Sequence, residues 1–113
     1  MRVLIACDKF KDALTAPQAC GVIADTLRTA HPDWVADPCP LADGGEGFAG
    51  ILTHAAGGRF LTAKVTGPRG APLEAGFGLV TLERIPAAAR ALLDLPAGTS
   101  PTATIAVIEM AAA

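Results

Sequence analysis

Apolar residues recur with two different periods along the chain, and the change of period predicts two kinds of structure. Residues 2–7 (RVLIAC) form a nearly continuous apolar run, which is typical of a strand covered on both faces. Beyond residue 58 the apolar positions alternate with polar or small ones, as in strands with one buried face. Two segments in between have helical spacing, with apolar residues at Ala19, Ile23, Leu27 and Ala30 and at Phe48, Ile51, Leu52 and Ala55.

Capping residues predict the limits of the first helix. Thr15 and Gln18 have the spacing of a capping box, and Pro17 suits a first helical turn. Pro32 disfavours helical angles in the residue before it, so we expect the helix to end near His31. A strand, a loop and a helix in this order open an α/β unit.

The α/β pattern continues up to a pair of glycines. Residues 34–41 (WVADPCPL) predict a weak edge strand, because Pro38 and Pro40 cannot donate ladder hydrogen bonds. The helix expected over residues 48–55 stops at Gly57-Gly58. The first part of the chain therefore reads as β-α-β-α.

The rest of the chain predicts antiparallel structure. It reads as a strand, a tight turn, a strand, a short helix and a strand, over residues 59–66, 67–70, 73–79, 86–95 and 104–110. We therefore predict a boundary near residue 58, between an α/β part over residues 1–58 and a part rich in antiparallel strands over residues 59–113. The last strand runs to the end of the sequence with no closing element.

Charge and composition exclude several classes of protein. A formal net charge of −2 without a basic block gives no sign of nucleic-acid binding, and no apolar run is long enough to cross a bilayer. The apolar start is too short for a signal peptide, so we expect a cytoplasmic protein. The 113 residues suffice for one domain, but 51% are hydrophobic. This excess suggests that something outside the chain covers part of its apolar surface.

The cysteines and histidines predict neither a disulfide framework nor a zinc site. Cys7, Cys20 and Cys39 are odd in number and widely spaced, so we expect reduced thiols. His31 and His54 lack partners at metal-ligand spacing, and we expect each to face solvent in the last turn of a helix.

Charged residues follow the first strand directly. Asp8, Lys9 and Lys11 stand at its carboxyl end, where open α/β sheets bind ligands. An acid and two amines there could orient a hydroxyl group, bind phosphate or hold a carboxylate. The alternative is a solvated loop.

The stretch Asp43-Gly44-Gly45-Glu46-Gly47 allows two interpretations. Asp43 at the N-cap and Glu46 at N3 would form a capping box for the following helix. That leaves Gly44 and Gly45 unexplained, since each costs up to about 1 kcal/mol there relative to alanine. The glycines indicate unusual backbone angles, or a ligand against bare N–H groups with a divalent cation between it and the acids.

Glu109 is a lone acid in the apolar segment AVIEMAAA. A buried carboxylate needs a partner or a raised pKa. Spacing alone favours the alternative that the side chain points outward at the end of the strand.

Four segments in order resemble the motifs of bacterial glycerate kinases. They are VLIACDKFKDALTAPQA, PLADGGEGF, KVTGPRGAPLEAGFG and AVIEMAAA, and together they cover nearly the whole chain. The corresponding family patterns are I-A-P-D-S-F-K-x-x-L-[ST]-A, P-x-A-D-G-G-E-G-T, V-T-G-P-L-G-x-P-V-x-A-x-[FY]-G and a fourth segment that continues with S-G-L. Each motif alone has little specificity, whereas four in order are specific.

The resemblance implies an ATP-dependent kinase that uses Mg²⁺ to phosphorylate a hydroxyl group of D-glycerate, leaving open whether at position 2 or 3. It implies a Rossmann-like α/β domain that begins over residues 1–58, with an inserted α+β domain from residue 59 and the active site between them. It also implies site residues: Asp8, Lys11 and Asp43 as catalytic, Gly44, Gly45, Glu46 and Glu109 as substrate- or nucleotide-binding, and Asp43 with Glu46 as metal ligands.

The chain departs from the family pattern in three respects. Cys7 replaces a proline and Lys9 a serine, the link over residues 81–104 is longer and carries the added helix PAAARALLDL, and the sequence ends within the inserted domain. We therefore expect the N-terminal part of a longer enzyme, inactive alone, whose open strands could pair in a homodimer. The alternatives are a stand-alone α/β module that binds a hydroxy acid or phosphate without catalysis, and a non-functional gene product.

Overall fold

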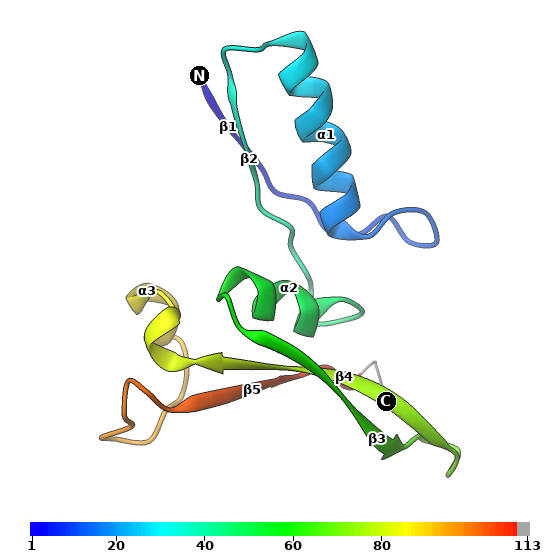
Figure 1. Ribbon diagram of the computed structural model, residues 1–113, viewed down its shortest axis with the longest axis vertical. Helices are drawn as coiled ribbons and strands as arrows, with labels where there is room; N and C mark the ends of the chain where they lie inside the picture. Colours follow the sequence, from blue (N-terminus) through cyan, green and yellow to red (C-terminus); the bar gives the residue numbers. More distant parts are fainter. Residues whose placement is uncertain (111–113) are drawn as a thin grey trace.

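The computed structural model describes residues 1–110 and contains two sheets with helices against them (Figure 1). The elements, in chain order, are β1 (Arg2–Ile5), α1 (Ala16–Ala30), β2 (Val35–Pro38), α2 (Phe48–Ala55), β3 (Arg59–Thr66), β4 (Pro72–Thr81), the 3₁₀ turn η1 (Leu82–Arg84), α3 (Ala87–Arg90) and β5 (Thr104–Ile108). The expected α/β beginning and antiparallel hairpin are confirmed.

In the first part, β1 and β2 pair in parallel and α1 packs against both. Helix α1 begins as predicted, because the Thr15 side chain accepts a hydrogen bond from the Gln18 amide and the Gln18 side chain accepts one from the Thr15 amide. The small core between α1 and the two strands consists of Ile5, Cys20 and Ala24.

Two expectations about the burial of this part are wrong. Within residues 1–110, α1 covers one face of β1, and Leu4 on the other face is 64% exposed. On α1 the buried residues are Ala16, Ala19, Cys20 and Ala24, whereas Ile23 is 39% exposed. Alanine and cysteine allow α1 to approach the two strands closely, and the helix faces them with this small-residue side.

In the second part, β3, β4 and β5 form an antiparallel sheet in that order, and α2 packs across it. The contact is closest where Thr53 of α2 meets Gly78 of β4, because a side chain at Gly78 would overlap Thr53. Thr53 is buried and its hydroxyl donates to the Ala49 carbonyl, so its polar atom is satisfied. Val80 and Leu82 complete this core.

The remaining elements are shorter than predicted. The helix expected over residues 86–95 covers only Ala87–Arg90. No residue of this turn is buried, so packing does not extend it beyond its weak local propensity. Strand β5 ends at Ile108, and residues 111–113 of the predicted apolar stretch lie outside the described residues.

The two parts give an elongated molecule, with β1, α1 and β2 at one end and the antiparallel sheet at the other (Figure 1). The radius of gyration is 16.7 Å, whereas a compact chain of this length would have about 13 Å. Helix α2 packs against the antiparallel sheet. A domain boundary at residue 58 remains a prediction.

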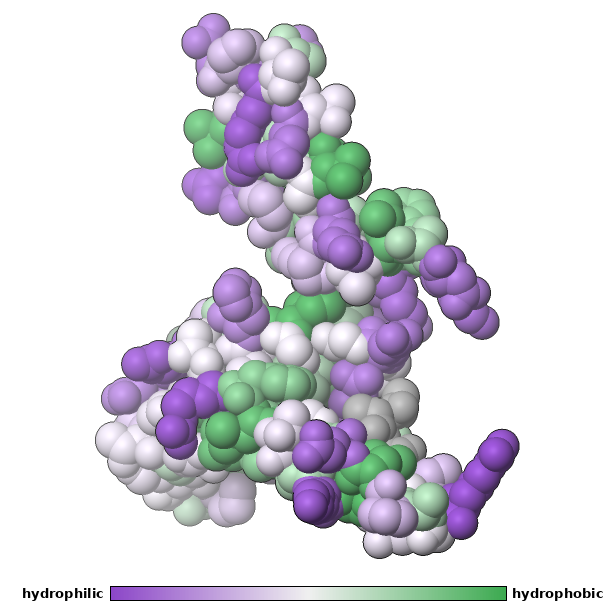
Figure 2. All heavy atoms as spheres, turned by 45° about the vertical axis from the view of Figure 1, so that its right-hand side comes forward, coloured by the Kyte–Doolittle hydropathy of each residue, from purple (hydrophilic) through white to green (hydrophobic). Residues whose placement is uncertain are grey.

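Apolar side chains are exposed on both parts of the molecule, where Figure 2 shows them as green patches. Examples are Leu4, Phe10 and Phe60, each more than half exposed. Among the described residues, no helix is both long and apolar enough to span a membrane.

Candidate functional site

The parallel pairing of β1 and β2 continues past the ends of both strands. The Cys39 amide donates to the Ile5 carbonyl at 2.8 Å, and the Leu41 amide donates to the Cys7 carbonyl at 3.0 Å. Because the strands are parallel, the chain leaves both at the same edge, which is where open α/β sheets bind ligands. The loop that starts at Asp8 therefore lies beside the segment that starts at Asp43.

Lys9 and Asp43 connect these two segments. The Lys9 ammonium is 3.7 Å from Asp43 Oδ1, and the same oxygen accepts a hydrogen bond of 3.0 Å from the Gly45 amide. The Gly45 amide first, and the Lys9 charge second, hold the pKa of Asp43 below its usual value. The Asp43 side chain is 71% exposed, so its carboxylate remains accessible to a ligand.

Unusual backbone angles were expected at Gly44 and Gly45, and the structure has them at Gly44 and at Gly47, which follows Glu46, but not at Gly45. Gly44 has φ 94° and Gly47 has φ 93°, both in the region that favours glycine. The predicted capping box is wrong, because α2 begins at Phe48 with Gly47 as its N-cap. The left-handed residues keep Asp43 and Glu46 outside the helix, and Asp43 instead closes a turn onto Gly45.

Glu109 satisfies the start of α2. Its Oε2 accepts hydrogen bonds of 3.1 Å from the Gly47 amide and 3.1 Å from the Ala49 amide, and the residue is only 8% exposed. The expectation that this carboxylate points outward is therefore wrong. The N–H groups and positive end of α2 stabilise the buried charge.

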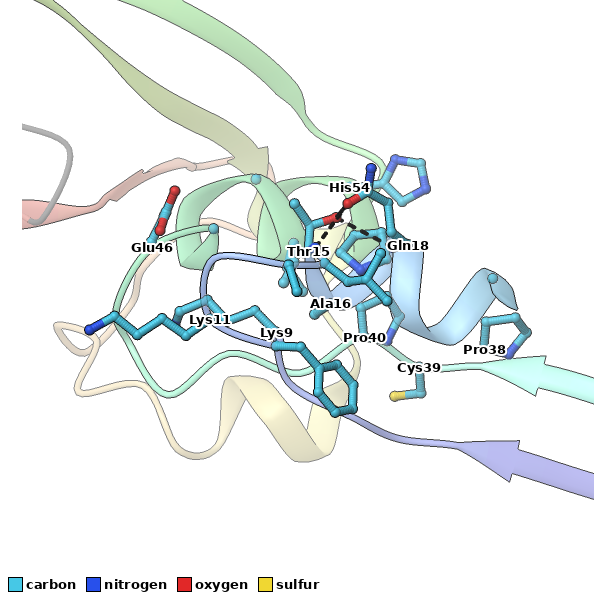
Figure 3. A pocket seen from close by; sticks show the side chains of 18 of the residues that line it. Lys9, Lys11, Thr15, Ala16, Gln18, Pro38, Cys39, Pro40, Glu46 and His54 are labelled. Atoms are coloured by element: carbon cyan, nitrogen blue, oxygen red, sulfur yellow. Dashed lines mark hydrogen bonds between the residues drawn. The ribbon is translucent and has the colours of Figure 1, made fainter. Parts of the chain in front are cut away.

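A cleft of about 1100 Å³ separates the loop after β1 from α2 (Figure 3). Figure 3 shows Glu46 near Lys9 and Lys11 toward one end, and His54 with Gln18 toward the other. Two ammonium groups in its wall suit an acidic ligand.

The predicted site residues lie in three positions relative to this cleft. Lys11 and Glu46 line it. Asp8 and Asp43 do not line it but contact Lys9, which does: Asp8 Oδ1 accepts a hydrogen bond of 2.6 Å from the Lys9 amide, and Asp43 pairs with the Lys9 ammonium. Glu109 is buried under α2.

The sequence-based interpretation did not identify three features of the site. Lys9 was expected in the charged loop and as a departure from the family pattern, but its ion pair with Asp43, which joins the two segments, was not predicted. Lys9 follows one parallel strand and Asp43 follows the next, and this arrangement in the sequence could have indicated the ion pair between them. Gln18 and His54 line the cleft from different helices, and no local motif connects them.

Metal binding by Asp43 and Glu46 also remains a prediction. Within residues 1–110, no group of three or more histidine, cysteine, aspartate or glutamate side chains could hold a metal ion. Two carboxylates still fit Mg²⁺, which usually keeps several waters and takes its other ligands from substrate phosphates.

Comparison with known proteins identifies the family. Residues 3–113 match the model of the glycerate kinase family. The chain is 39% identical to a Bacillus subtilis glycerate kinase over 80 residues, which are 71% of this chain and 21% of the relative. It is 35% identical to an Escherichia coli glycerate 2-kinase over 79 residues, which are 70% of this chain and 21% of the relative. A crystal structure of a Salmonella typhimurium LT2 protein assigned as glycerate kinase 2 superposes with a TM-score of 0.63 at 38% identity, over 71% of this chain and 21% of that one. The chain thus spans about a fifth of the length of these relatives, and it belongs to the glycerate kinase family.

Proposed function

We propose that this chain forms part of an enzyme that transfers the γ-phosphoryl group of ATP to a hydroxyl group of D-glycerate. The observation that carries the proposal is the meeting of the Asp8–Lys11 loop with the acidic glycine segment 43–47 at one edge of the parallel strands. Family membership supplies the reaction class. The amines suit the carboxylate of glycerate and the phosphates of ATP.

Lys11 is the residue we propose to contact the anionic part of a substrate, because it lines the cleft and is exposed. Asp43 is less suited to act as a general base, since its lowered pKa makes it a weak proton acceptor. We therefore favour Asp43 as a ligand of Mg²⁺ or as an acceptor that orients the substrate hydroxyl.

Asp43 and Glu46 would hold Mg²⁺ together with phosphate oxygens and water. When bound, the ion would neutralise charge on the transferring phosphoryl group. Gly44 and Gly45 carry no side chains, and a Cβ at Gly44 would meet nothing within 4 Å, so a ligand could approach the backbone there.

We expect the 113-residue chain alone to show no turnover. Phosphoryl transfer requires cations and donors around the γ-phosphate from several directions, and this chain spans about a fifth of its relatives. Turnover that depends on both ATP and D-glycerate in the purified chain would contradict this expectation.

The proposal is tested with Asp43→Asn in the natural polypeptide that contains this chain. We expect kcat to fall about 100-fold or more, while the free energy of unfolding changes little because Asp43 is exposed. A coupled ADP-release assay with D-glycerate measures kcat, and urea titration measures stability.

Asp33→Asn, an exposed aspartate in the turn after α1, is the matched control and should leave both quantities unchanged. Loss of stability without loss of kcat would indicate that Asp43 only shapes the turn. Phosphorus NMR of the product would separate 2-phosphoglycerate, which the name of the Escherichia coli relative favours, from 3-phosphoglycerate.

A further inference from the structure

Two cysteine side chains touch inside the first part of the molecule. The Sγ atoms of Cys7 and Cys20 are 3.3 Å apart. The Cys20 thiol, on α1, also donates to the Ile5 carbonyl at 3.4 Å, which leaves its sulfur as the acceptor for the Cys7 thiol. A disulfide has an S–S distance of about 2.05 Å, so the two sulfur atoms need to approach by little more than 1 Å.

The two thiols differ in their access to solvent. Cys20 is fully buried in the core with Ile5 and Ala24, whereas Cys7 is half-buried and follows the end of β1. A small oxidant in water can therefore reach Cys7 but not Cys20. Cys39, the third cysteine, is exposed.

We propose that Cys7 and Cys20 form a redox modification site that hydrogen peroxide converts to an intramolecular disulfide. In the first step the Cys7 thiolate attacks one peroxide oxygen, the O–O bond breaks, and the departing hydroxide takes up a proton to become water. The product is a sulfenic acid at Cys7.

In the second step the Cys20 sulfur attacks the Cys7 sulfur. The S–S bond forms, the S–O bond breaks, and the leaving hydroxide takes the Cys20 proton as a second water. The two thiols lose two electrons in total, and the peroxide gains them. A dithiol reductant reverses the modification.

The surroundings of Cys7 set the conditions for the first step. The hydrogen bond to Cys20, burial and the negative charge of Asp8 raise the pKa of the Cys7 thiol. Thiolate is therefore scarce at neutral pH, and oxidation is faster in mildly alkaline buffer.

The disulfide would tie the end of β1 to the first half of α1. The segment between the two cysteines carries Lys9, Lys11 and Gln18, which line the cleft. Closing this loop covalently restricts the conformations of one wall of the cleft. This inference does not depend on the proposed phosphoryl transfer.

The test uses a Cys39→Ser variant of the 113-residue chain, which removes the exposed thiol. The folded protein is treated with hydrogen peroxide near pH 8.5, the ordinary pKa of a free thiol, then alkylated and digested with trypsin. We expect the intact protein to lose two hydrogen atoms, and the peptides of residues 3–9 and 12–28 to be recovered as one linked species. Dithiothreitol should separate them again.

A second variant, which also carries Cys20→Ala, identifies the first thiol to react. Dimedone, which traps sulfenic acids, should label Cys7 in this variant and leave it unlabelled when Cys20 is present. The proposal is overturned if peptides 3–9 and 12–28 stay separate after oxidation of the Cys39→Ser protein, or if dimedone labels Cys7 equally in both. If Cys20→Ala fails to fold, the linked peptide decides alone.

Discussion

Lys9 contributes, after the Gly45 amide, to the electrostatics of Asp43 at the edge of the parallel strands. Its ammonium is 3.7 Å from the Asp43 carboxylate, where the family pattern has a serine. Because the side chain of Asp43 is largely exposed, the ion pair contributes little to stability. Its effect is on the charge available to a ligand.

We predict that Lys9→Met raises the pKa of Asp43 toward the value of an ordinary aspartate. The rise is partial, because the Gly45 amide is the larger cause of the lowered pKa and remains. Carbon-13 NMR of the carboxyl group during a pH titration measures the change, with Lys11→Met as the control. An unchanged Asp43 titration in Lys9→Met would show that the ion pair does not form in solution.

The same lowered pKa fixes the sign of the pH dependence. A carboxylate whose pKa is lower in the folded state stabilises the fold above the pKa of the unfolded chain. That contribution is lost as the pH falls through the lowered pKa. The Lys9→Met variant should therefore show a smaller loss of stability in this acidic range.

Glu109 is the residue that joins β5 to the start of α2. Removing it in Glu109→Ala leaves the Gly47 and Ala49 amides without their buried acceptor. We expect a loss of about 1–3 kcal/mol in the free energy of unfolding. Glu109→Gln keeps an acceptor oxygen and loses only the charge at the positive helix end, which costs about 0.3–1 kcal/mol.

Urea denaturation of the two variants distinguishes this role from others. Equal losses in Glu109→Ala and Glu109→Gln would mean that the charge matters and the hydrogen bonds do not. Stability equal to that of the unmodified chain in both would contradict the capping role.

At the scale of elements, the packing of α2 on β4 depends on a glycine. A side chain at Gly78 would overlap Thr53, whereas Gly21 in α1 has no atom within 4 Å of the position of a Cβ. We predict that Gly78→Ala destabilises the chain by about 1–3 kcal/mol, because α2 must move away from the sheet.

Gly21→Ala is the matched substitution, with the opposite expected sign. It lies in the helix Ala16–Ala30, where alanine is favoured over glycine by up to about 1 kcal/mol. Thermal unfolding of both variants measures the contrast. A stabilising Gly78→Ala would refute the close contact between α2 and β4.

At the scale of the whole molecule, the two parts have unequal cores. The core of the first part contains Ile5, Cys20 and Ala24, and its sheet has two strands. The second part has a three-stranded sheet with α2 packed across it. The first part ends with β2 at Pro38. A segment of fewer than about 40 residues rarely folds stably without further support, so we expect the first part to be the less stable of the two.

We predict that amides of β1 and β2 exchange with solvent faster than those of β4 in the 113-residue chain. Local opening of the smaller part exposes less apolar surface and therefore costs less free energy. Hydrogen–deuterium exchange followed by mass spectrometry measures both regions in one sample. Equal protection would show that the parts unfold as one unit.

Elements with a local signal were predictable from the sequence. The capping box of Thr15 and Gln18 fixes the start of α1 from residues that are neighbours in the chain. The hairpin of β3 and β4 follows from its alternation and its glycine turn. The order of the four motifs was enough to predict the family.

Tertiary structure decided the contacts between distant residues. Glu109 reaches amides 62 and 60 residues away, so no local pattern could replace the incorrect capping box of Asp43 and Glu46. The Lys9–Asp43 pair and the touching thiols of Cys7 and Cys20 depend on how β1, β2 and α1 pack. Hydropathy and caps act over a few residues, whereas the partner of a buried charge or thiol is chosen by packing in space.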